Sequence, residues 1–216
     1  MERRTSAFYQ RRHRDRLREQ GLVKKELWVR PEYADELLEI ERQMRHPRGA
    51  QEEPMVDAMP AAAQASAGPR LGPAPLWTAT ALHAALSACE PVREGAVSVE
   101  LIEGAEPGLY LKMREYGDLP LFMAVVGRQI VVEALLWPVS QVRDPAHFNE
   151  ALLRTHKLFP LSTLGIEVMG GESVYIMFGA LSAGSSLAEV LFEIETLADN
   201  VIRATEAYEN HLREVA

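Results

Sequence analysis

The chain has 216 residues, of which 47% are hydrophobic and 25% charged, a composition typical of globular rather than disordered or fibrous proteins. The net charge of −8 argues against a general nucleic-acid binder, and a single cysteine, Cys89, excludes an intramolecular disulfide framework. The N-terminus lacks the apolar segment of a secretory signal, and no uncharged apolar run reaches the roughly 18 residues that span a bilayer. We therefore expect a cytoplasmic protein.

Positive charge is concentrated at the N-terminus. Residues 1–30 carry ten Lys and Arg against four Asp and Glu, whereas residues 76–216 carry nine against nineteen. Residues 8–20 are predicted to form a short basic helix that ends at Gly21, because glycine readily adopts the left-handed conformation that closes a helix. This asymmetry indicates that any nucleic-acid contact is made by the N-terminal segment alone.

The next part of this segment predicts a strand and a second helix. Residues 23–29 alternate as in a short strand, and Pro31 suits the first position of a helix. An apolar stripe at helical spacing follows, formed by Tyr33, Leu37, Ile40 and Met44. Strand, proline and amphipathic helix resemble the opening of ribbon-helix-helix and MazE-like antitoxin proteins, in which paired strands lie in the major groove.

The positive charge of the first predicted helix and this resemblance together predict a nucleic-acid contact surface within residues 1–45. Its members are Arg11, Arg12, Arg14, Arg16, Arg18, Lys24, Lys25 and Trp28. Binding that relies on phosphate contacts would weaken steeply as salt rises. The alternative is a basic arm that docks on protein or dimerises, because Glu26 and Trp28 are poor readers of bases and no second helix completes the motif.

Residues 46–75 are rich in proline and alanine and contain almost no large apolar side chain. They cannot bury enough surface to offset the entropy lost on ordering, so we expect a disordered linker. The chain then divides into a basic segment (1–45), the linker (46–75) and a body (76–216). Across such a linker the basic segment and the body are expected to move independently.

The body begins with a predicted helix over residues 77–89, with Thr78 as its N-cap. Alternating apolar residues predict half-buried strands at 96–103 and 109–114. Two longer apolar runs, at 119–126 and 130–137, predict a hairpin of central strands.

A second helix is predicted to start at Asp144-Pro145 and to end at Pro160. Residues 164–168 and 174–178 predict another hairpin, and a capping box at Ser186 and Glu189 starts a last helix that runs to about Arg213. The order α-β-β-β-β-α-β-β-α predicts an α+β fold with an antiparallel sheet and a long C-terminal helix. Apolar steps of three and four in the last helix predict packing against another helix, with a second chain as a candidate.

No arrangement of reactive residues stands out. The six histidines lack zinc-site spacing, and Cys89 lies on an apolar helix face, which favours a buried small side chain over a nucleophile. Residues 179–186 precede a helix N-terminus but lack the lysine of a phosphate-binding loop, so a plain strand-to-helix connection is favoured. We expect no catalytic, cofactor-binding or metal-binding residues, and no enzymatic activity.

Four carboxylates of the last predicted helix form a second candidate surface. They are Glu189, Glu193, Glu195 and Asp199. A metal site would need further ligands from a facing helix, which the sequence does not supply. The remaining interpretations are a solvated helix face and an acidic surface offered to a basic protein partner.

Three long segments of the body resemble the bacterial YjfI family, a domain of unknown function. They are YGDLPLFMAV, VEALLWPVSQVRDPAHFNEALLRTHKLFPLSTLGIE and YIMFGALSAGSSLAEVLFEIETLADNVIRATEAYE, within residues 76–212. The resemblance implies a cytoplasmic bacterial protein whose gene often neighbours one for a PspA-like (phage-shock-protein-A-like) membrane-remodelling protein. The layout is also similar to YbjN and type III secretion chaperone folds, which implies a dimer that binds protein partners.

Two functional hypotheses follow. The first is a non-enzymatic, homodimeric adaptor or chaperone-like protein linked to a PspA-type membrane-stress system. The alternative is a DNA-binding transcriptional regulator that acts through residues 1–45. Deletion of residues 1–45 separates them, because partner binding would survive only in the first.

Overall fold

The structure is a computed structural model that describes residues 5–24, 37, 40, 44 and 76–213. Contacts group the chain into two units, Met1–Arg16 with Ala74–Ala216, and Leu17–Pro73. Most of the predicted strand at 23–29, most of the helix that follows Pro31, and the predicted linker up to residue 75 lie outside the described residues.

The predicted basic helix is confirmed as α1, Ser6–Glu19. The helix terminates before Gly21, as predicted. Gly21 adopts the left-handed conformation, with a φ of 79°, and its N–H donates a hydrogen bond to the carbonyl of Arg18.

The body opens with α3, Ala79–Ser87, whose predicted N-cap Thr78 accepts a hydrogen bond from the N–H of Ala81. A short helix that was not predicted, α4 (Glu90–Arg93), follows, with a proline in its first turn. The next four elements are strands that pair antiparallel in chain order: β1 (Val97–Ile102), β2 (Gly108–Met113), β3 (Leu119–Val126) and β4 (Gln129–Pro138).

The second half of the body also follows the predicted order. A 3-10 turn, η2 (Val139–Gln141), leads to α5 (Pro145–Thr155), capped by Asp144 as predicted, and to η3 (His156–Leu158). The predicted hairpin is formed by β5 (Thr163–Met169) and β6 (Glu172–Ser182). The capping box of Ser186 and Glu189 starts α6 (Leu187–Ala207), and η4 (Glu209–His211) follows.

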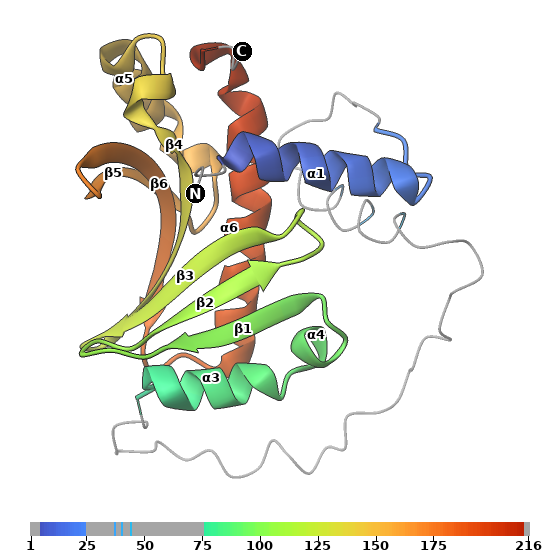
Figure 1. Ribbon diagram of the computed structural model, residues 1–216, viewed down its shortest axis with the longest axis vertical. Coiled ribbons are helices and arrows are strands. Elements are labelled where there is room, and N and C mark those ends of the chain that lie inside the picture. The colour runs from blue at the N-terminus through green and yellow to red at the C-terminus, as the bar shows by residue number, and fades with distance from the viewer. Residues whose placement is uncertain (1–4, 25–36, 38–39, 41–43, 45–75, 214–216) are drawn as a thin grey trace. The chain divides into compact units, whose positions relative to one another are not determined.

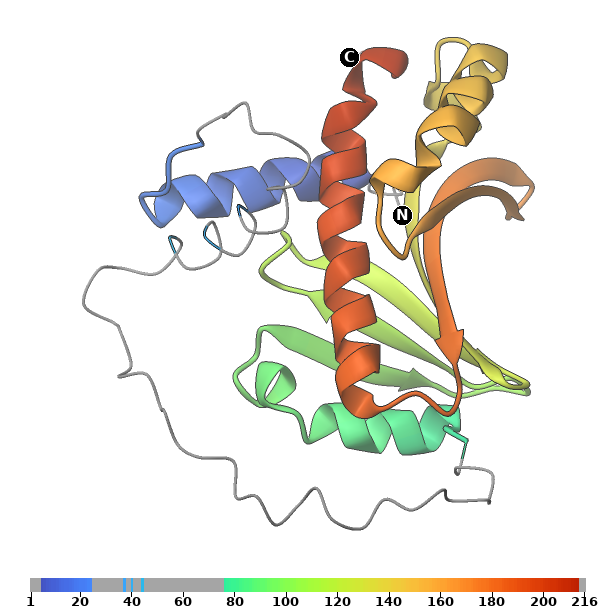
Figure 2. The ribbon, with the colours of Figure 1, turned by 180° about the vertical axis from the view of Figure 1, so that it is seen from behind.

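The six strands form one antiparallel sheet in the order β1-β2-β3-β4-β6-β5. This confirms the predicted α+β class. Strands β1, β2 and β3 lie in front of α6 in Figure 1, whereas α6 lies in front of the sheet in the reverse view of Figure 2. Helix α6 therefore covers one face of the sheet, and β1 and β5 are its two edges.

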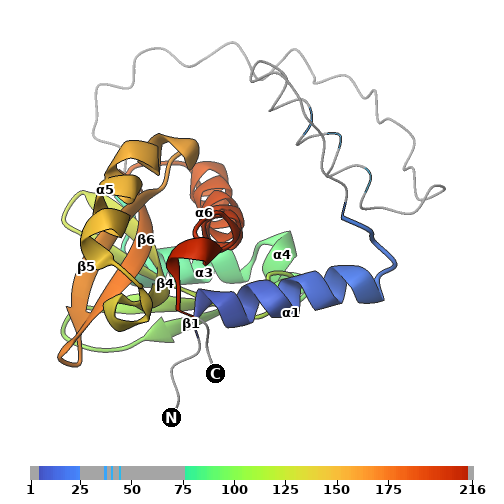
Figure 3. The ribbon, with the colours of Figure 1, turned by 90° about the horizontal axis from the view of Figure 1, so that it is seen from above.

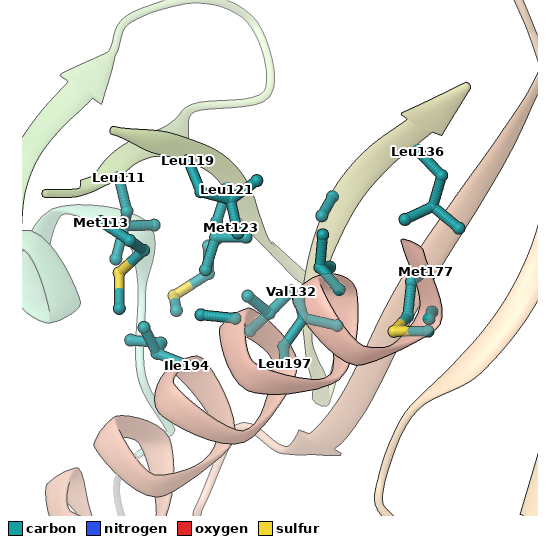
Figure 4. Packing of buried hydrophobic residues seen from close by; sticks show 14 of the residues in the cluster. Leu111, Met113, Leu119, Leu121, Met123, Val132, Leu136, Met177, Ile194 and Leu197 are labelled. Atoms are coloured by element: carbon teal, nitrogen blue, oxygen red, sulfur yellow. The ribbon is translucent and has the colours of Figure 1, made fainter. Parts of the chain in front are cut away.

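The hydrophobic core lies between α6 and the sheet. Ile194 and Leu197 of α6 point toward buried side chains of the strands in Figure 4, among them Leu111, Met123 and Val132. The prediction that the apolar stripe of this helix meets another helix was wrong, because the stripe packs on the protein's own sheet. Spacing of three and four marks one buried helix face and leaves the identity of its partner open.

Helix α5 extends this core beside the C-terminal end of α6 (Figure 2). Phe148 of α5 packs edge-to-face against Tyr175 of β6 and against Tyr208, with ring centroids 5.1 and 5.3 Å apart. The view from above in Figure 3 shows α5 over β5 and β6, beside the nearly end-on α6. The described helices of the body thus gather on a single face of the sheet.

Candidate protein-interaction surface

The first part of α1 packs on the body through polar contacts. The ring of His13 stacks on Tyr116 at 5.4 Å, and its Nδ1 lies 2.7 Å from the carbonyl oxygen of Glu115. Arg12 forms an ion pair of 2.6 Å with Asp118. Residues before Leu17 therefore belong to the same unit as the body, whereas the rest of the predicted basic segment belongs to the other unit.

The residues predicted to contact nucleic acid have different environments in the structure. Arg12 forms an ion pair with Asp118, and the guanidinium of Arg14 lies 3.4 Å from the carboxylate of Glu206 in α6. Arg11 and Arg18 are exposed on α1, and Arg16 is half-buried. Lys24 is exposed, whereas Lys25 and Trp28 lie outside the described residues.

The four carboxylates predicted to form one acidic face of the last helix do not share an environment. Glu189 belongs to the capping box, where its side chain accepts from the N–H of Ser186, and this bond lowers its pKa. Glu195 is exposed and Asp199 half-buried, whereas Glu193 is only 5% exposed.

Glu193 points toward the sheet at Gly179 of β6. A Cβ at Gly179 would overlap the Glu193 Oε1 atom, so the absence of a side chain there makes room for the carboxyl group. Oε1 has no hydrogen-bond partner among the described residues, and burial raises the pKa of the carboxyl. Glu193 is therefore a buried group rather than part of a solvated face.

The sheet face opposite α6, here called the open face, carries no helix among the described residues of the body. Alternation along each strand directs one set of side chains to the core and the other set to the open face. In β3, for example, Leu121 is buried and Phe122 is half-buried. The open face is therefore a surface of the body on which a partner can be sought.

A continuous row of side chains crosses the open face. The pairing register places each member directly opposite the next, in the order Glu100, Tyr110, Phe122, Glu133, Phe178, Thr163. Tyr110 and Phe122 meet at a ring-centroid distance of 5.5 Å. The row thus combines two carboxylates and three aromatic rings on five strands and ends at Thr163 on the sixth.

Three carboxylates on the open face lie outside the ion pairs of the described residues. Burial and then Glu167 of β5 raise the pKa of Glu133, and burial followed by Glu100 and Asp118 raises the pKa of the Tyr110 hydroxyl. Glu100, Glu133 and Glu167 form no ion pair with any residue that the structure describes. A cationic group placed over Glu133 would relieve its repulsion with Glu167.

Sequence reasoning did not single out this row as a site. Alternation did place Ser98, Glu100, Tyr110 and Lys112 on one side of the first two strands. The missing information was the register, which brings Glu133 and Phe178 into line with Glu100 although they are distant in sequence. Among the described residues, no group of three His, Cys, Asp or Glu side chains is arranged to hold a metal ion.

The body is thus a two-layer α+β domain with helices on one face of an antiparallel sheet. Residues 76–212 match the family described as "Uncharacterized protein conserved in bacteria (DUF2170)". "Uncharacterized protein YjfI" from Escherichia coli K12 is 40% identical over 135 residues, covering 62% of this chain and 97% of the relative, and the O157:H7 protein of that name matches equally. The chain therefore belongs to this family, as its resemblance to YjfI predicted.

A solved structure of YbjN from E. coli aligns with a TM-score of 0.37 and 16% identity, over 51% of this chain and 84% of that one. None of the helices in the described part of the chain combines the length and apolar character needed to cross a membrane.

Proposed function

We propose that the protein is a non-enzymatic adaptor that binds a partner protein through the open face of its sheet. The observation that supports this is the cross-strand row from Glu100 to Thr163, with its unpaired carboxylates and half-buried rings. Half-buried aromatic residues become fully buried when a partner covers them, and such residues dominate binding energy at interfaces.

The chemistry of the row defines the partner. Aromatic rings flanked by carboxylates favour Lys or Arg side chains, which neutralise Glu100 and Glu133 and lay their stems and charged groups on Tyr110 and Phe122. We therefore propose a partner segment that presents basic and apolar side chains together. Attraction between opposite charges would raise the association rate and the selectivity more than the affinity.

The first partner to test is a PspA-like membrane-remodelling protein. The reason is the resemblance to the YjfI family, which implies that the two genes are often neighbours. The intact chain would be mixed with the purified PspA-like protein, and binding measured by calorimetry over a range of salt concentrations. The same assay applies to any protein that co-purifies with the chain from cells.

The decisive variants change charge on and off the open face. Glu100→Lys replaces an exposed carboxylate at one end of the row, and Glu94→Lys makes the same charge change at the C-cap of α4. We expect Glu100→Lys to weaken partner binding about tenfold or more, and Glu94→Lys to leave it nearly unchanged. Equal affinities for both variants would contradict a role of the open face.

A regulator that binds DNA through the N-terminal segment remains the alternative, supported by the formation of α1 with five arginines. Because Arg12 is paired with Asp118, Asp118→Asn should strengthen DNA binding if this helix contacts phosphates. A mobility-shift titration at low salt tests this, and no binding by the wild type or by Asp118→Asn would exclude it.

A further inference from the structure

Strand β5 is an edge of the sheet, and its one partner among the described strands is β6. Its side chains Ile166 and Val168 are 48% and 73% exposed. The opposite edge differs, because α3 and α4 pack against β1. An apolar edge strand without proline or lysine is a template for pairing with a further strand.

The two sides of β5 differ in chemistry. Ile166 lies opposite Tyr175 and Leu164 opposite Met177, both core residues, so Leu164, Ile166 and Val168 project on the α6 side of the sheet. Gly165 and Glu167 project on the open face. A strand added at this edge must therefore present apolar side chains on one face and tolerate a carboxylate on the other.

We propose that a second copy of this chain supplies that strand, by antiparallel pairing of β5 with β5 about a twofold axis at Ile166. In this register Ile166 faces its own equivalent, and Leu164 faces Val168 of the second copy. Glu167 then faces Gly165 of the second copy, which has no side chain to oppose it. In this register the apolar side chains of the two strands meet, and the two Glu167 carboxylates do not face each other.

Pairing of the two strands about a twofold axis at a neighbouring residue is less favourable. An axis at Glu167 would place two Glu167 carboxylates directly opposite each other, and like charges in that position destabilise a pair. An axis at Gly165 would place exposed Val168 opposite Ser162, which precedes the strand and is buried in its own copy. A shift by one residue would pair the apolar side of one copy with the open-face side of the other.

This interface does not depend on the proposed adaptor function, because it uses the edge of the sheet and leaves the open face uncovered. It would join two six-stranded sheets into one, with two rows of carboxylates and rings on the same side. Loss of the dimer and loss of partner binding are therefore separate outcomes, measured by different assays.

Two substitutions at Gly165 test the register. A side chain is sterically tolerated there, since a Cβ would make ordinary contacts of 3.5 Å with Ile176 and Phe178. Gly165→Lys should tighten the dimer about 2- to 30-fold through two new pairs with Glu167 of the other copy, and Gly165→Glu should weaken it by a similar factor. Sedimentation equilibrium of the full chain measures both.

A cross-link gives an independent readout. In a Cys89→Ser background, Ile166→Cys should form an intermolecular disulfide under mild oxidation, whereas Ile102→Cys, 46% exposed on β1, should not. Monomeric wild-type protein at all concentrations would overturn the proposal. So would a dimer that responds equally to lysine and glutamate at position 165, or that cross-links equally through position 102.

Discussion

Glu193 gives the sharpest prediction about stability. Its side chain is 5% exposed, Oε1 lacks a hydrogen-bond partner among the described residues, and burial raises its pKa. A carboxyl with a raised pKa in the folded state binds its proton more tightly there than in the unfolded chain. Its contribution therefore destabilises the fold increasingly as pH rises from the unfolded-state pKa, about 4.3, through the folded-state pKa.

Glu193→Gln keeps the shape and removes the charge. Because a buried carboxylate costs more to desolvate than a neutral amide of the same shape, we expect the variant to be more stable at pH 8 by about 1 kcal/mol or more, which raises Tm by about 2–4 °C for each kcal/mol. The gain should shrink as pH falls toward 4.5, because the raised pKa of the carboxyl leaves less of it charged there. Urea unfolding at both pH values measures this, with Glu103→Gln, an exposed position, as control.

The reasoning would be refuted if Glu193→Gln were no more stable than the wild type at pH 8. A gain of the same size at pH 4.5 and pH 8 would also contradict it, because the effect would then come from packing rather than charge.

Two further predictions concern the docked helix and the open face. Gly117→Ala and Gly95→Ala introduce the same backbone strain, at φ values of 73° and 80°, but only at Gly117 would the new Cβ lie 2.6 Å from the carbonyl oxygen of Tyr9. We expect hydrogen exchange in α1 to accelerate only in Gly117→Ala, and equal exchange in both would contradict the docking. Glu100→Gln should lower the pKa of Tyr110 in an ultraviolet titration, because Glu100 raises it. An unchanged pKa would contradict their proximity across the strands.

Much of the fold could be predicted because its signals are local. The bounds of β3 match the predicted run at 119–126, and Asp144, Ser186 and Thr78 cap their helices as their sequence contexts indicated. Each of these signals depends on residues within a few positions of one another. At that range, N-cap hydrogen bonds and the periodicity of apolar residues determine the local structure.

The candidate site could not be predicted in the same way, because it depends on contacts between distant residues. No local pattern aligns Glu100 with Glu133, or places α1 against Glu115 and Asp118. Glu193 did carry a signal, since it lies three residues after buried Val190, on the apolar side of its helix. A buried position for this carboxylate could have been predicted, but its contact with Gly179 could not.

The most direct test of the account maps the partner's footprint on the intact chain. Amide chemical shifts would be recorded by NMR while the purified partner is added. We predict that the largest changes fall on the strands of the open face, around Glu100, Tyr110 and Phe122, and that Glu100→Lys requires about tenfold or more partner to produce them. Changes confined to the solvent side of α6, with the strands unaffected, would contradict the assignment of the open face as the binding surface.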